Sequence, residues 1–84
     1  MTLDEKEREI FLYNMRVLKR TYKTNKEFFN SIGIDESLFT LWNYGRRKPR
    51  VNTVIKICKN LNIDLEDIVS KKIKIKIICT FEED

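Results

Sequence analysis

Four cations crowd into five positions near the middle of the chain, in a run interrupted only by Pro49: Arg46, Arg47, Lys48 and Arg50. Guanidinium and ammonium groups on a loop neutralise phosphate charge, and such contacts fix the register of a protein on a nucleic-acid backbone. The alternative is an ordinary solvated turn. Between Arg16 and Lys59 the chain holds eleven basic and three acidic residues, so positive charge is concentrated around this run. The distribution predicts attraction to a polyanion.

The residues just ahead of the run have an apolar side and a polar side. At about 100° per residue, a helix here groups three large apolar residues on one side: Leu38, Phe39 and Trp42. Five others share an arc of about 140° on the opposite side: Glu36, Ser37, Thr40, Leu41 and Tyr44. The pattern predicts a helix that buries one face, with Trp42 in the core, and leaves the other face free to contact a partner.

Two short helices hinged at Gly33 must position that free face. Thr24 and Glu27 fit a capping box at the start of the first helix, because each side chain can pair with the backbone N–H of the other. The apolar stripe of this helix is Phe28, Phe29 and Ile32. Gly33 can adopt the left-handed conformation that commonly ends a helix. Asp35 can then cap the start of the second helix.

These segments resemble the helix-turn-helix of the phage repressor and Cro family, also called the XRE family. The register of its motif is kept by Gly33-Ile34, Phe39-Thr40 and Trp42-Asn43-Tyr44-Gly45. Residues 45–49 resemble the family's Gly-Lys-x-x-Pro loop, residues 54–63 its next helix, and residues 14–19 its Asn-Ile-Arg-x-Leu-Arg segment. The match covers about residues 11 to 68. The resemblance implies a mainly α, five-helix lambda-repressor-like domain, which we expect at residues 1–70.

The resemblance also implies which residues meet double-stranded DNA. The base-reading positions are Glu36, Ser37, Thr40, Leu41 and Tyr44. The residues expected at phosphates are Asn25, Arg46, Arg47, Lys48, Arg50 and Arg16. Two positions depart from the family pattern. Phe29 replaces an Ala, so the two helices must open or tilt to admit a ring. Asn43 replaces a Glu that pairs with the residue at position 16, which leaves Arg16 for a phosphate or another carboxylate.

The other helices follow from local signals. Thr2 and Glu5 fit a capping box, and nothing interrupts a helix from there to about Tyr22. Its core stripe repeats at helical spacing: Phe11, Met15, Leu18 and Tyr22. A fourth helix is expected from about Val51 to Asn60, and Asp64 can cap a short fifth helix that reaches Val69.

The last segment, residues 71–84, changes period and ends in an acidic tail. Residues 72–81 alternate strictly, with lysines on one face and five apolar residues on the other: Ile73, Ile75, Ile77, Cys79 and Phe81. A lone β-branched strand leaves an unpaired edge. Antiparallel pairing with a second copy closes that edge, so we expect a homodimer with these five residues at its interface. The alternatives are a strand packed over its own helices and a segment disordered in isolation.

The sequence lacks the residues that several classes of function require. The chain has no His, and Cys58 and Cys79 form no Cys-x-x-Cys pair, so we expect no metal and no cofactor. Without a Gly-rich phosphate loop we expect no enzyme activity. No run approaches the roughly 20 apolar residues of a membrane span, and no signal-peptide pattern opens the chain. We therefore expect a cytoplasmic protein without membrane contact, and nothing indicates a small-molecule effector.

Two functions fit these features. The first is a dimeric, sequence-specific transcriptional regulator, a Cro-like repressor that reads a palindromic operator through the major groove. The second is a protein-interaction module such as an antitoxin or antirepressor. Three residues on the expected recognition helix keep the second interpretation open: Asp35, Glu36 and Leu41.

Overall fold

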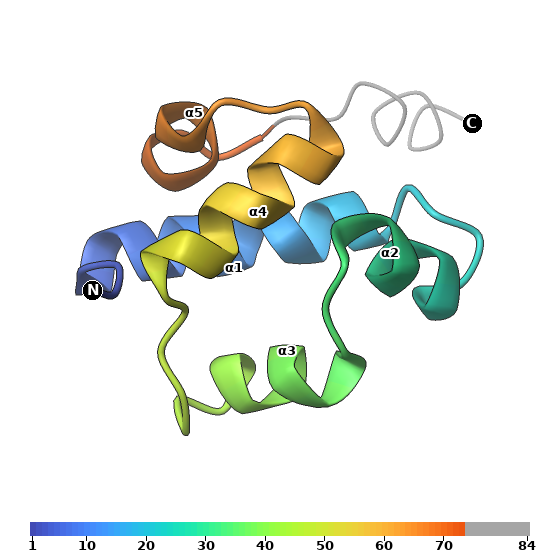
Figure 1. Ribbon diagram of the computed structural model, residues 1–84, viewed down its shortest axis with the longest axis horizontal. Coiled ribbons are helices and arrows are strands. Elements are labelled where there is room, and N and C mark those ends of the chain that lie inside the picture. The colour runs from blue at the N-terminus through green and yellow to red at the C-terminus, as the bar shows by residue number, and fades with distance from the viewer. Residues whose placement is uncertain (74–84) are drawn as a thin grey trace, which may run out of the picture.

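The fold is built from helices alone in the part of the chain that the computed structural model describes, residues 1–73 (Figure 1). The helices are α1 (Glu5–Lys19), α2 (Asn25–Ile32), α3 (Glu36–Asn43), α4 (Val51–Leu61) and α5 (Leu65–Ser70). The long α1 packs against α5, α2 packs against α4, and α3 lies along one edge of the domain. The predicted mainly α, five-helix architecture is confirmed. Within the described range no helix is both long and apolar enough to cross a membrane.

The boundaries of α1 differ from the prediction. Its capping box is formed by Asp4 and Glu7, with Asp4 Oδ1 accepting from the Glu7 N–H at 2.8 Å, and not by Thr2 and Glu5. The helix ends at Lys19, because the next N–H groups turn back to carbonyls three residues earlier in a tight turn. This turn places the ring of Tyr22 against Phe28, with centroids 5.4 Å apart, instead of continuing the helix.

The turn between α2 and α3 follows its sequence signals. Thr24 Oγ1 accepts from the Glu27 N–H at 3.1 Å, which is one half of the predicted capping box. Gly33 ends α2 with a φ of 80°, and its N–H donates to the Phe29 carbonyl at 2.9 Å. Asp35 occupies the N-cap position of α3, although its side chain makes no capping hydrogen bond. The turn between α2 and α3 therefore depends on the left-handed conformation of Gly33 more than on capping by Asp35.

An aromatic cluster fixes the helices around this turn. Phe28 is fully buried and meets Phe29 edge-on, with ring centroids 5.1 Å apart. Phe29 in turn lies 5.5 Å from Phe39, so the ring that departs from the family pattern fills space between α2 and α3. Trp42 is 3% exposed and meets Phe11 of α1 at 5.7 Å, which confirms its predicted place in the core. Such edge-to-face pairs add to the stabilisation that burial supplies.

The first three residues form a strap that the sequence analysis did not foresee. Thr2 makes an isolated antiparallel β-bridge with Arg50. The Leu3 N–H donates to the Pro49 carbonyl at 3.3 Å, and the Val51 N–H donates to the Met1 carbonyl at 3.0 Å. The Leu3 side chain is buried in the main core. The strap therefore ties the residues just before α4 to the body of the domain.

The chain leaves α5 along a fixed path. Asn14 of α1 is fully buried, and its side chain binds backbone groups of Ile68, Lys71 and Ile73. Ile73 is partly buried against the core of its own chain. The remaining residues of the predicted dimer interface lie outside the described residues, as does most of the predicted strand: Ile75, Ile77, Cys79 and Phe81.

Candidate nucleic-acid interface

Helix α3 presents a polar face because its opposite face is anchored in the core. Phe39 and Trp42 are buried in the core, while Leu38 is partly buried between the core and the solvent. Of the five residues predicted to read bases, four are exposed: Glu36, Ser37, Thr40 and Tyr44. Tyr44 is 76% exposed. Leu41 is partly buried. The periodicity thus places the predicted residues on the outward side of α3, with Leu41 at its margin.

The side chains on this face differ in what they can still bind. The Thr40 hydroxyl donates to the Glu36 carbonyl at 3.0 Å, so its hydrogen is occupied while its oxygen lone pairs and its methyl group stay available. The Ser37 hydroxyl has no hydrogen bond in the described part of the chain and is free to donate or accept. Glu36 can only accept when ionised. In the described part of the chain, this face therefore offers acceptors, the free hydroxyl groups of Ser37 and Tyr44, and small apolar groups.

The cationic loop leaves the end of α3 through a Schellman motif. The Arg46 N–H donates to the Leu41 carbonyl at 2.9 Å, and the Gly45 N–H donates to the Trp42 carbonyl at 3.1 Å. Gly45 takes the left-handed conformation that this motif needs, with a φ of 73°. The loop consequently starts from a defined backbone geometry at the carboxyl end of α3.

The far end of the loop is anchored as well. Pro49 is fully buried, and its carbonyl accepts the bond from the strap at Leu3. The four cations around it are all exposed: Arg46, Arg47, Lys48 and Arg50. A buried proline and a paired backbone hold the loop in place while its four charged side chains remain exposed. The backbone of the cationic loop is therefore fixed at both ends.

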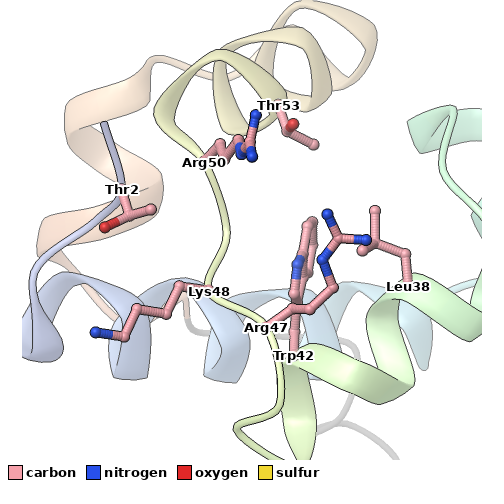
Figure 2. Close-up of a pocket in the computed structure, with 7 residues that line it drawn as sticks. All are labelled: Thr2, Leu38, Trp42, Arg47, Lys48, Arg50 and Thr53. Carbon is pink, nitrogen blue, oxygen red and sulfur yellow. The ribbon is translucent and has the colours of Figure 1, made fainter.

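An open hollow of about 340 Å³ lies between α3, the loop and the start of α4 (Figure 2). Its lining is Thr2, Leu38, Trp42, Arg47, Lys48, Arg50 and Thr53. Arg47 extends beside the Trp42 ring toward Leu38, Arg50 lies near Thr53, and Lys48 points the other way (Figure 2). Sequence reasoning missed Thr2 and Thr53 as part of this surface. The signal for Thr2 was its neighbour Leu3, an apolar residue isolated in a polar amino terminus.

The last two residues predicted at phosphates occupy different settings. Arg16 is exposed, and its Nη1 donates to Asn43 Oδ1 at 3.0 Å, so a hydrogen bond to a neutral amide takes the place of the family's ion pair. Arg16 is thereby held at the carboxyl end of α3, close to the start of the loop. Asn25 is exposed at the first position of α2, and no hydrogen bond in residues 1–73 joins its side chain to α3 or to the loop.

A recognition helix with one outward polar face, followed by an anchored cationic loop, defines a helix-turn-helix DNA-binding protein. The family model of the Cro/C1-type HTH DNA-binding domain matches residues 14–72. The chain belongs to this family and is a DNA-binding transcription regulator, of a family whose members are typically not enzymes. No curated protein and no solved structure matches it.

Proposed function

We propose that the protein is a Cro-like repressor that binds a palindromic operator as a homodimer. The observation that carries this proposal is the pairing of the exposed face of α3 with the anchored cationic loop directly after it. One element supplies groups that distinguish bases, and the other supplies charges that hold the phosphate backbone. A cytoplasmic location follows from such a role.

The side chains on α3 suggest particular base contacts. Glu36 can accept a hydrogen bond from cytosine N4, and Ser37 can donate to or accept from either type of base pair. The Thr40 methyl group and Leu41 can contact the methyl group of thymine. Tyr44, at the carboxyl end of the helix, would contact a base or the adjacent sugar. These contacts would occur in the major groove, where every base pair presents a distinct pattern.

Most phosphate contacts would come from the carboxyl end of α3. Arg46, Arg47, Lys48 and Arg50 follow its carboxyl end, and Arg16 is held there by Asn43. The positive end of the α4 dipole lies beside the same loop and adds to the attraction. Asn25 would contribute a neutral hydrogen bond from the start of α2. About five phosphate contacts per subunit, ten per dimer, give a log–log salt slope of binding near −9.

The dimer would form through residues 71–84. An antiparallel pairing of two copies of the alternating segment satisfies the strand edge and relates the two recognition helices by a two-fold axis. The half-sites would then lie about 34 Å apart, one turn of the double helix. A two-fold symmetric protein on this spacing reads a near-palindrome.

The first experiment is selection from random double-stranded DNA with the full-length protein and with the Arg47→Ala/Lys48→Ala double variant. We expect enrichment of a two-fold symmetric motif, with the double variant binding the same motif more weakly and with a salt slope reduced by about 4 per dimer. A motif without symmetry would contradict the dimer. If the dimer is intact and no motif is enriched, the result would favour the alternative function, a protein-interaction module.

A further inference from the structure

We propose that Leu3 is a positioning residue for DNA binding, which acts by holding Arg50 at the hollow beside the cationic loop. The inference rests on the phosphate contacts of the proposed function, and it adds a residue that itself touches neither a base nor a phosphate. Leu3 is 5% exposed and belongs to the main core. The strap formed by residues 1–3 therefore has a fixed anchor from which it can order the end of the loop.

The strap pairs with the end of the cationic loop as a short piece of antiparallel β-structure. Thr2 lies opposite Arg50. Two backbone bonds flank this pair, from the Leu3 N–H to the Pro49 carbonyl at 3.3 Å and from the Val51 N–H to the Met1 carbonyl at 3.0 Å. Opposite residues that share no bond of their own bring their side chains closest together. The side chains of Thr2 and Arg50 accordingly line the same hollow (Figure 2).

Alternation of side chains along the two paired segments couples Leu3 to Arg50. On the strap, Leu3 is buried and Thr2 is exposed, and on the loop, Pro49 is buried and Arg50 is exposed. One face of the bridge thus lies in the core and the other lies at the hollow. A rotation that turned Arg50 away from the hollow would carry Leu3 out of the core, where its burial is favourable.

The strap also satisfies a donor that the residue before α4 cannot. Arg50 occupies the N-cap position of α4, where its side chain makes no capping hydrogen bond, because a guanidinium has no acceptor. The Val51 N–H is one of the groups that a helix start leaves without an intrahelical partner, and it donates to the Met1 carbonyl instead. The strap therefore compensates in part for a cation at a position where other helices have a polar acceptor.

Without the strap, Arg50 would keep its charge but lose its fixed place. The start of the loop would still be held by the Schellman motif after α3, whereas its end would no longer be paired. An arginine on a looser backbone loses more conformational entropy when it binds a phosphate. We expect the equivalent of one phosphate contact per subunit to be lost, while the other cations of the loop continue to attract DNA.

The test is a double-mutant cycle between Leu3→Ala and Arg50→Ala, with affinity for a short random-sequence duplex measured over a range of KCl concentrations. Each single variant should lower the log–log salt slope by about 1 per subunit, which weakens binding roughly tenfold at about 0.1 M salt. The double variant should lose no more than either single variant, because Leu3 acts through Arg50. Ile68→Ala truncates a fully buried side chain of α5 and controls for lost stability, so it should keep the wild-type slope.

Val51→Pro and Val51→Ala test the strap if Leu3→Ala does not fold. Proline removes the N–H that donates to Met1, and it suits the first position of a helix. It also suits the extended conformation of the preceding Arg50, with φ of −83° and ψ of 144°. Alanine keeps the N–H and shortens the side chain. We expect Val51→Pro to lower the salt slope by about 1 per subunit and Val51→Ala to keep it.

A wild-type salt slope in folded Leu3→Ala or in Val51→Pro would overturn the inference, and so would losses that add up in the double variant. The random-sequence duplex separates this inference from the operator, because phosphate contacts do not depend on sequence. A wild-type protein that binds the duplex with a steep slope but enriches no symmetric motif would contradict the proposed function and leave the role of Leu3 standing.

Discussion

The guanidinium of Arg16 donates to the side-chain oxygen of Asn43 across 3.0 Å, and this bond joins α1 to the carboxyl end of the recognition helix. Asn43 is neutral, so the bond positions Arg16 without cancelling its charge. A carboxylate at the same place would hold the helix equally well but would neutralise one cation of the surface that we propose binds phosphate. The amide of Asn43 therefore holds Arg16 against α3 and leaves the positive charge of Arg16 available.

Asn43→Glu is expected to weaken DNA binding while the domain stays folded. The new carboxylate pairs with Arg16 and takes it away from phosphate, so the log–log salt slope per subunit should fall by about 1. The measurement is affinity for the selected motif over a range of KCl concentrations. Asn43→Gln is the matched control, because it retains a neutral amide and should leave the slope unchanged. Equal slopes for the two variants would show that Arg16 makes no phosphate contact.

Trp42→Ala should cost roughly 3–5 kcal/mol in the free energy of unfolding. The ring is 3% exposed and packs edge-on against Phe11 and Phe39, at 5.7 and 6.4 Å. Chemical denaturation measures the loss. Tyr44→Ala serves as the control on the same helix, since a side chain that is 76% exposed should change stability by no more than about 0.5 kcal/mol. Similar losses in the two variants would contradict the anchoring of α3 through Trp42.

Gly33→Ala should be more destabilising than Gly45→Ala, although both glycines are left-handed, with φ of 80° and 73°. Alanine in this conformation costs about 1–2 kcal/mol at either position. At Gly33 the added methyl carbon would also lie 3.0 Å from the Nδ2 of Asn60, which donates to the Ile32 carbonyl. At Gly45 the space is open. Urea unfolding of the two variants tests the order. In an Asn60→Ala background, which has already lost the bond to Ile32, Gly33→Ala should cost only the conformational part.

Cys58 should react slowly with thiol reagents even at alkaline pH. Burial raises the pKa of its thiol above the ordinary value of 9.0, and the nearby charge of Asp64 raises it further. The unfolded chain ionises first as the pH rises, so the folded state loses stability above that ordinary value. Reaction with an aromatic disulfide in a Cys79→Ser background measures the accessible thiolate. Asp64→Asn should speed the reaction, and an unchanged rate would contradict the electrostatic part.

The helix-turn-helix was predictable because its signals are local. Thr24, Gly33 and the spacing of Phe39 and Trp42 lie within one continuous stretch, and each acts on its immediate neighbours. The outward face of α3 followed from the same periodicity. Leu41 is only partly exposed. It lies at the margin of the outward face, where the burial of a side chain depends on how closely the neighbouring element packs.

What the sequence could not predict depends on contacts between distant residues. Thr2–Glu5 and Asp4–Glu7 both fit the spacing of a capping box. The second pair forms the box because Thr2 is already engaged with Arg50. Asn14 matched the family pattern, yet nothing local reveals that its partners are the backbone groups after α5. Contacts between residues far apart in the sequence determine both features, and the periodicity of the sequence does not predict such contacts.

The strap at the amino terminus has a consequence for the order of folding. The α2 and α3 pair can form from contacts within a short stretch, whereas the cationic loop is held by a bridge from the second residue of the chain to the fiftieth. Closing so long a loop costs more chain entropy than local contacts do, so it is favoured only once the helices have assembled. A partly folded chain would have α3 before it has an anchored cationic loop. If this loop holds phosphate as we propose, the chain gains tight DNA binding only on completing its fold.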